Sequence, residues 1–133
     1  MKKYKPIRIL VCGGRDYGAG DDGAAFAAMV YLLNKISVNG ARPVTVIHGG
    51  AKGADALAGQ WAFNTHTPYE VYPADWYPKN DGVLDRGAGF KRNAEMLVKG
   101  KPDMVIAFPG GKGTADMVAR ARAAGVKVFE VPR

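Results

Sequence analysis

Short apolar segments alternate with amphipathic segments along the whole chain, and this alternation constrains the fold more than any other feature. The short segments are rich in β-branched residues, as strands are, and cover residues 7–12, 44–48, 69–73, 103–108 and 126–131. The first, second and fourth are almost wholly apolar, which is typical of strands buried on both faces. Apolar residues at helical spacing fill the intervals, over residues 24–38, 54–66, 89–99 and 114–124.

Strand–helix–strand alternation predicts a parallel sheet with right-handed crossovers. We therefore expect an α/β protein with a single domain over residues 1–133. The expected domain is Rossmann-like and three-layered, with a five-stranded parallel sheet in the order 3-2-1-4-5. A chain of 133 residues is long enough to bury such a core without disulfides.

Composition excludes several classes of site. Cys12 is the only cysteine, and His48 and His66 have no partner at ligand spacing, so we expect no disulfide, no metal and no cofactor. The apolar runs are too short to cross a membrane and the N-terminus lacks the features of a secretory signal, which predicts a cytoplasmic protein. The formal net charge of +7 indicates anionic partners, or else an ordinary basic surface.

Glycine-rich loops follow the first, second and fourth predicted strands, with the sequences GGRD, GGAKGAD and PGGKGT. In the expected order these strands are neighbours, so the loops leave one edge of the sheet at its switch point, where open α/β sheets bind ligands. Glycine lets a ligand approach the backbone, and the N–H groups at a helix start favour an anion. Tight turns explain any one such loop, whereas three on one edge predict a phosphate or nucleotide site.

The predicted ligand-binding residues come from these loops, from the end of the second strand and from the segment KRNAEM. They are Gly13, Gly14, Arg15, Asp16, His48, Gly49, Gly50, Lys52, Gly53, Asp55, Arg92, Asn93, Pro109, Gly110, Gly111, Lys112, Gly113 and Thr114.

Several of these residues have two interpretations. Arg92 either holds a phosphate or lies on a solvated helix face. Asp16 either binds ribose hydroxyls or forms a turn. Asp55 lies in the first turn of a predicted helix, and a favourable interaction with the helix dipole is sufficient to explain it. His48 points either at a ligand or into the core. In the long polar stretch 73–88, Trp76 either stacks on a base, with the loop as a lid, or anchors the loop to the domain.

Standard nucleotide motifs do not fit the chain. Lys112 is followed by Gly113 rather than by Ser or Thr, which excludes a Walker loop. The stretch GAGDDG, at residues 18–23, has the spacing of a dinucleotide fingerprint. It begins several residues after the first strand and places acidic residues where a pyrophosphate would lie, so we reject an NAD site.

The loops resemble those of a known superfamily. PGGKGTADM is similar to the PGG-x-GT motif of the Lonely Guy type cytokinin-activating phosphoribohydrolases, also called lysine decarboxylase-like proteins. HGGAKGADALA is similar to the glycine motif in the Rossmann core of the DNA-processing protein A group. Together with CGGRDY and RNAEML, they most resemble the small YspA-type proteins of the SLOG superfamily, over nearly the whole chain.

This resemblance implies a Rossmann-like domain that binds a nucleotide or a nucleotide derivative as a sensor. A phosphoribohydrolase and a DNA-binding protein of the DNA-processing type are the alternatives. In the phosphoribohydrolases, an arginine before the PGG motif and a glutamate three residues after its threonine serve catalysis. Arg92 matches the arginine, but Met117 occupies the glutamate position. Asp116 is one residue away, which is a rotation of roughly 100° on a helix.

Arg92, Glu95 and Asp116 are therefore the catalytic candidates, and whether there is turnover stays open. The resemblance also implies a homodimer, because small SLOG-like domains commonly pair. A nucleotide-derived small molecule is the favoured partner, ahead of nucleic acid.

Overall fold

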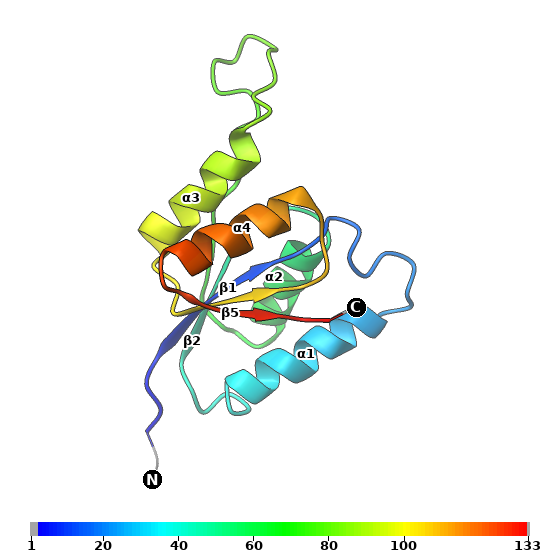
Figure 1. The fold of residues 1–133 in the computed structure, drawn as a ribbon. Helices are drawn as coiled ribbons and strands as arrows, with labels where there is room; N and C mark the ends of the chain where they lie inside the picture. The colour runs from blue at the N-terminus through cyan, green and yellow to red at the C-terminus, as the bar shows by residue number, and fades with distance from the viewer. Residues whose placement is uncertain (1–2, 133) are drawn as a thin grey trace.

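In the computed structural model, which describes residues 3–132, five parallel strands form one sheet in the order β3-β2-β1-β4-β5 (Figure 1). The strands are β1 (Ile7–Cys12), β2 (Val44–His48), β3 (Tyr69–Val71), β4 (Met104–Ala107) and β5 (Lys127–Glu130). Leu10 of β1 lies opposite Ile47 of β2 and Val105 of β4, so the three most buried strands are neighbours. The predicted fold class and strand order are confirmed.

In the described part of the chain, four helices cover the two faces of the sheet and complete three layers (Figure 1). They are α1 (Ala24–Ile36), α2 (Ala54–Asn64), α3 (Ala88–Gly100) and α4 (Lys112–Ala123). Because side chains alternate along a strand, Ile9 and Leu10 enter different cores. The core on one face includes Leu33 of α1 and Trp61 of α2, and the core on the other includes Met96 of α3 and Met117 of α4.

Some elements begin or end within a few residues of the predicted bounds. α1 ends at Ile36 because Val38 and Asn39 take left-handed backbone angles, with φ of 51° and 52°. α4 begins at Lys112, so Gly113 belongs to the first turn of the helix. A glycine costs little there, because the first N–H groups of a helix make no intrahelical bonds in any case.

The segment between β3 and α3 leaves the domain and projects beyond α3 (Figure 1). Its base is closed by a hydrogen bond of 2.7 Å from the Asp85 N–H to the Trp76 carbonyl. Lys91 on α3 forms an ion pair with Asp85 at 2.7 Å. The part beyond this base points away from the sheet, and only the base approaches the loops described below.

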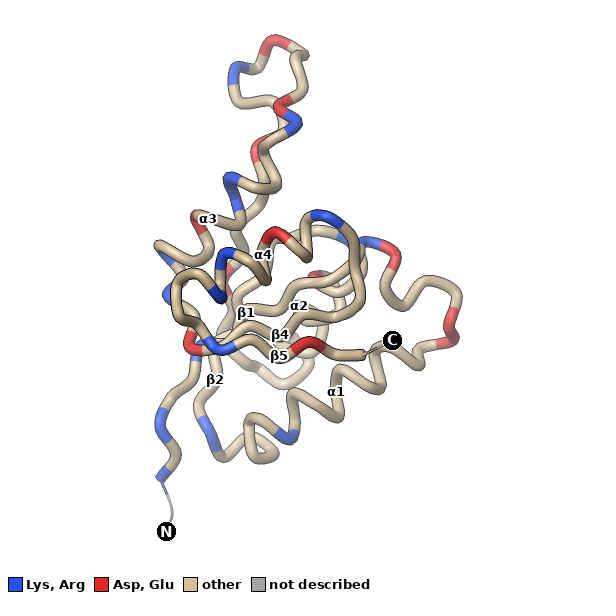
Figure 2. Tube along the Cα trace, in the orientation of Figure 1, with Lys and Arg blue, Asp and Glu red and all other residues tan. Residues whose placement is uncertain are grey.

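Lysine and arginine are spread along the trace from the N-terminal segment to α4, with acidic residues between them (Figure 2). Among the helices in the described part of the chain, none combines the length and apolar character needed to cross a membrane.

Candidate ligand-binding site

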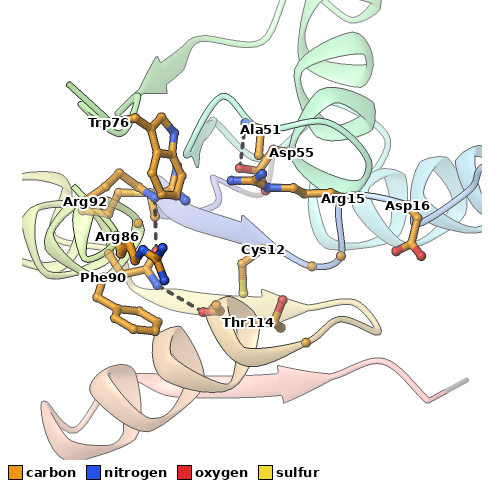
Figure 3. Close-up of a pocket in the computed structure, with 17 residues that line it drawn as sticks. Cys12, Arg15, Asp16, Ala51, Asp55, Trp76, Arg86, Phe90, Arg92 and Thr114 are labelled. Carbon is orange, nitrogen blue, oxygen red and sulfur yellow. Dashed lines mark hydrogen bonds between the residues drawn. The ribbon is translucent and has the colours of Figure 1, made fainter. Parts of the chain in front are cut away.

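The loops after β1, β2 and β4 meet at the carboxyl ends of their strands and line one cavity with the N-terminal half of α3 (Figure 3). Its volume is about 430 Å³, and small-molecule sites usually measure roughly 300–1,000 Å³. The lining residues are Cys12, Gly13, Gly14, Arg15, Asp16, Ala51, Asp55, Trp76, Arg86, Gly89, Phe90, Arg92, Asn93, Met96, Gly111, Gly113 and Thr114.

The backbone of Gly14 joins the three loops. Its N–H donates to the Pro109 carbonyl at 2.9 Å, and its carbonyl accepts from the Ala54 N–H at 3.2 Å. A Cβ atom at Gly53 would overlap the Gly14 carbonyl oxygen, and one at Gly110 would lie 2.7 Å from the Gly14 nitrogen. Gly53 and Gly110 are therefore glycines because the loops pack closely at these two points.

The N-terminus of α4 opens into the cavity. Gly111, Gly113 and Thr114 line the cavity, and the first N–H groups of a helix lack intrahelical acceptors. A Cβ atom at Gly111 or Gly113 would meet no atom within 4 Å. The helix start is thus open to a ligand, and its partial positive charge favours an anion.

At the corresponding loop after β2, a side chain already accepts the backbone hydrogen bonds. Asp55 is buried, and its Oδ2 atom accepts from the Gly49 N–H at 3.0 Å and from the Ala51 N–H at 3.3 Å. Burial raises the pKa of Asp55, although these bonds and the charges of Arg92 and Arg15 act in the opposite direction. The backbone N–H groups at the start of α4 are therefore more available to an anion than those of the loop before α2.

Arg92 reaches from α3 across the cavity to the loop after β2. Its Nη1 donates to the Gly49 carbonyl at 2.6 Å, and its Nε donates to Asn93 Oδ1 at 3.2 Å. A Cβ atom at Gly49 would overlap the guanidinium. Burial lowers the pKa of Arg92, but an arginine stays protonated in proteins. The structure thus provides a fixed positive charge in the cavity wall.

Asn93 is held in one orientation by α4. Its Nδ2 donates to the Gly113 carbonyl and to Asp116 Oδ2, both at 3.1 Å. Asp116 also accepts from Arg120 Nε at 2.8 Å. Asp116 therefore lies behind Asn93 and does not line the cavity.

Of the catalytic candidates, the structure brings only Arg92 to the cavity wall. Met117, at the family's glutamate position, is fully buried in the core under α4. Glu95 is exposed on α3 and lies 4.0 Å from Lys99. Cys12 lines the floor of the cavity, but burial, with the Asp55 charge, raises the pKa of Cys12 to about 12. It stays a neutral thiol at physiological pH and is a poor nucleophile.

Two further arginines line the cavity, so its charged lining residues are Arg15, Arg86 and Arg92 together with the two carboxylates Asp16 and Asp55. The Arg15 guanidinium lies over the Trp76 ring, 5.3 Å from its centroid. Cations therefore outnumber carboxylates around the cavity, and an aromatic face lies beside them.

Several predicted binding residues do not line this cavity. Gly49, Gly50 and Lys52 line an adjoining one, and Pro109 and Gly110 line two other hollows. Lys112 and Gly53 line none of these. The His48 side chain is buried, with its ring centroid 6.4 Å from that of Tyr69, so the structure places it in the protein interior.

Lowering the pH through the range in which histidine titrates should destabilise the domain through His48. Its Nδ1 accepts the Gly50 N–H at 3.0 Å, which a protonated ring cannot do. Burial lowers the pKa of His48, and the Arg92 charge acts in the same direction. The unfolded chain therefore binds the proton first, below a pH of about 6.5. The free energy of unfolding should fall there by at most ~1.4 kcal/mol per pH unit.

Urea unfolding between about pH 7 and pH 5 measures this effect. His48→Asn should remove the slope due to this group. His66→Asn is the control, because His66 is exposed and has φ of 54°, an angle that asparagine tolerates. This variant should keep the slope due to His48. An unchanged slope in His48→Asn would contradict the prediction.

The sequence interpretation missed Ala51, Arg86, Gly89, Phe90 and Met96 as lining residues, and it gave no role in the site to Cys12. One signal for part of this set was present. Gly89, Asn93 and Met96 are spaced four and three apart, which places them on one face of a helix. Arg86 carried no such signal, because it lies in the irregular segment before α3.

The family pattern of the YspA, cpYpsA-related SLOG proteins matches residues 7–77, from β1 to the base of the projecting segment. The chain belongs to this family. A relative, the gene 61 protein of Mycobacterium phage D29, is 39% identical over 132 residues, which cover 92% of this chain and 94% of the phage protein. The SLOG membership inferred from the loops is confirmed.

Solved structures share the fold of this SLOG domain. TM1055 matches with a TM-score of 0.67 and 18% identity, over 92% of this chain and 72% of its own. DNA processing protein A from Streptococcus pneumoniae matches with a TM-score of 0.70 and 18% identity, over 96% of this chain but 50% of its own. At this identity the likeness concerns the fold alone.

Proposed function

We propose that this SLOG domain binds a nucleotide or a nucleotide derivative in the cavity and acts as a sensor without turnover. A phosphate lies at the N-terminus of α4, beside Arg92. The observation that carries the proposal is the meeting of an open helix start with three arginines and an aromatic ring around one cavity. Phosphate, sugar and base each find a suitable group there, since arginine binds phosphate and aromatic rings stack on bases.

The position of the carboxylates supports binding without hydrolysis. The family's glutamate position is a buried methionine, Met117. Asp116 is engaged by Asn93 and Arg120, and Asp55 accepts two backbone N–H groups. A second candidate function, N-glycosidic hydrolysis, is favoured by one observation, which is that Asp16 is exposed and lines the cavity.

A thermal-shift screen with AMP, ADP-ribose, NAD, cyclic nucleotides and single-stranded DNA tests the proposal. Stabilisation by a nucleotide without release of free base is the expected result, since binding to the folded state raises its stability. Release of free base would contradict the sensor function and support N-glycosidic hydrolysis instead. Stabilisation by DNA alone, with strong salt dependence, would replace both by a DNA-binding function.

Arg92→Ala is expected to weaken nucleotide binding by roughly 10-fold to 100-fold, because a hydrogen bond to a charged group contributes about 1.5–3 kcal/mol. Isothermal titration calorimetry measures the change. Arg122→Ala is the matched control, since Arg122 is an exposed residue of α4 that pairs with Glu130 and lies outside the cavity. Equal affinities of Arg92→Ala and the wild type would place the anion elsewhere.

The homodimer and the cytoplasmic location stay predictions.

A further inference from the structure

A second cavity, of about 420 Å³, adjoins the first. The two share Arg15, Ala51, Trp76 and Arg92 as lining residues. The residues that line the second cavity and not the first include Lys52 and the Gly49–Gly50 turn. The two cavities are therefore compartments of one larger depression, divided by side chains that belong to both.

Arg15 and Trp76 contact each other at that division, which Arg92 also lines. Arg15 extends from the loop after β1 toward Asp55 and Trp76 (Figure 3), and its guanidinium lies 5.3 Å from the centroid of the indole. The backbone at Trp76 is fixed by the hydrogen bond from Asp85 to the Trp76 carbonyl. Arg15, in contrast, is an exposed residue, and a cation–π contact at an exposed site is weak. Arg15 is thus the member of the pair that a ligand can displace.

The second cavity is positive. Its ionisable lining residues are Arg15, Lys52 and Arg92, and among residues 3–132 no acidic one lines it. Asp16 and Asp55, the two carboxylates of the site, line the first cavity. A group that enters the second cavity is therefore best matched if it is anionic or rich in hydrogen-bond acceptors.

We propose that the ligand spans both cavities and is longer than a mononucleotide, an inference that rests on the proposed nucleotide binding. On binding, a planar base replaces the guanidinium on the face of Trp76, and Arg15 turns to a phosphate. The phosphate carries a further group, which lies beside Lys52. The ligand class is a nucleoside diphosphate joined to a sugar or to a second nucleoside.

Calorimetric titration of the full chain with AMP and with ADP-ribose tests this inference. ADP-ribose should bind at least tenfold more tightly than AMP. Lys52→Ser should weaken ADP-ribose at least fivefold and AMP less than twofold. Lys35→Ser, which removes an exposed lysine of α1, should change neither.

Three outcomes would overturn the inference. Equal affinities for the two probes, or equal effects of Lys52→Ser on both, would leave the proposed function standing but return the ligand to a mononucleotide. Failure of both probes to bind in these titrations, together with no nucleotide stabilisation in the thermal-shift screen, would overturn the proposed function itself and this inference with it.

Tryptophan fluorescence provides a second readout. The chain has two tryptophans, and Trp61 is buried in the core under α2. Saturating ADP-ribose should change the emission of the wild type and leave that of Trp76→Phe unchanged. Wild-type emission that does not respond to bound ADP-ribose would overturn the stacking of a base on Trp76.

Discussion

Gly53→Ala should lower the free energy of unfolding by roughly 3 kcal/mol or more. Gly53 has φ of 74°, and its Cβ would overlap the Gly14 carbonyl oxygen and lie 2.6 Å from the Arg15 carbonyl carbon. With ψ of −126°, these backbone angles lie outside the regions open to other residues. Such strain costs about 1–3 kcal/mol, and overpacking against a fixed backbone adds about 1–3 kcal/mol. In a domain of this size the melting temperature should fall by roughly 10 °C.

Gly40→Ala separates the two causes. Gly40 has φ of 90°, but its Cβ would meet no atom within 4 Å, so only the strain of about 1–2 kcal/mol applies. Urea unfolding followed by circular dichroism compares both variants with the wild type. If the free energy of unfolding falls equally in the two variants, the close contact with Gly14 does not contribute to the loss of stability in Gly53→Ala.

Gly111→Val should abolish nucleotide binding, with a loss of at least roughly 100-fold, or about 2.7 kcal/mol. Gly111 precedes the first residue of α4 and lines the cavity, and its Cβ would meet no protein atom within 4 Å. The added side chain would therefore occupy space at the helix start that a phosphate needs. Calorimetric titration with ADP-ribose measures the loss.

Ala119→Val is the matched control for this variant, because Ala119 is exposed on α4 and lies outside the cavity. It should bind ADP-ribose as the wild type does. Gly111→Val should also stay folded at the wild-type melting temperature, to within about 3 °C. Wild-type affinity in Gly111→Val would place the site away from α4.

The sheet and the meeting of its loops could be predicted because they depend on local patterns. Residues 7–12 and 44–48 are strands with the expected bounds, since each apolar run ends at a pair of glycines. Carboxyl ends of neighbouring parallel strands share an edge, so the order alone brings Gly14, Gly49 and Gly111 together.

The remaining part of the site depends on contacts between segments that local patterns do not fix. The conformation of the segment before α3 decides that Trp76 and Arg86 face the cavity, and its irregular backbone has no periodicity to interpret. The orientation of His48 was open for another reason. β2 is buried on both faces, so the sequence pattern of the strand does not distinguish a side that faces a ligand from one that faces the core.

The hydrogen bonds of Gly14 have a consequence for how the molecule forms. They connect the turn after β1 to Ala54 in the first half of the chain and to Pro109 in the second. Contacts between such distant residues slow folding, because chain entropy must be lost before they are made. A folding intermediate that consists of β1, α1, β2 and α2 would lack the start of α4. Recognition is therefore a property of the fully assembled domain, and a bound ligand would slow its global unfolding.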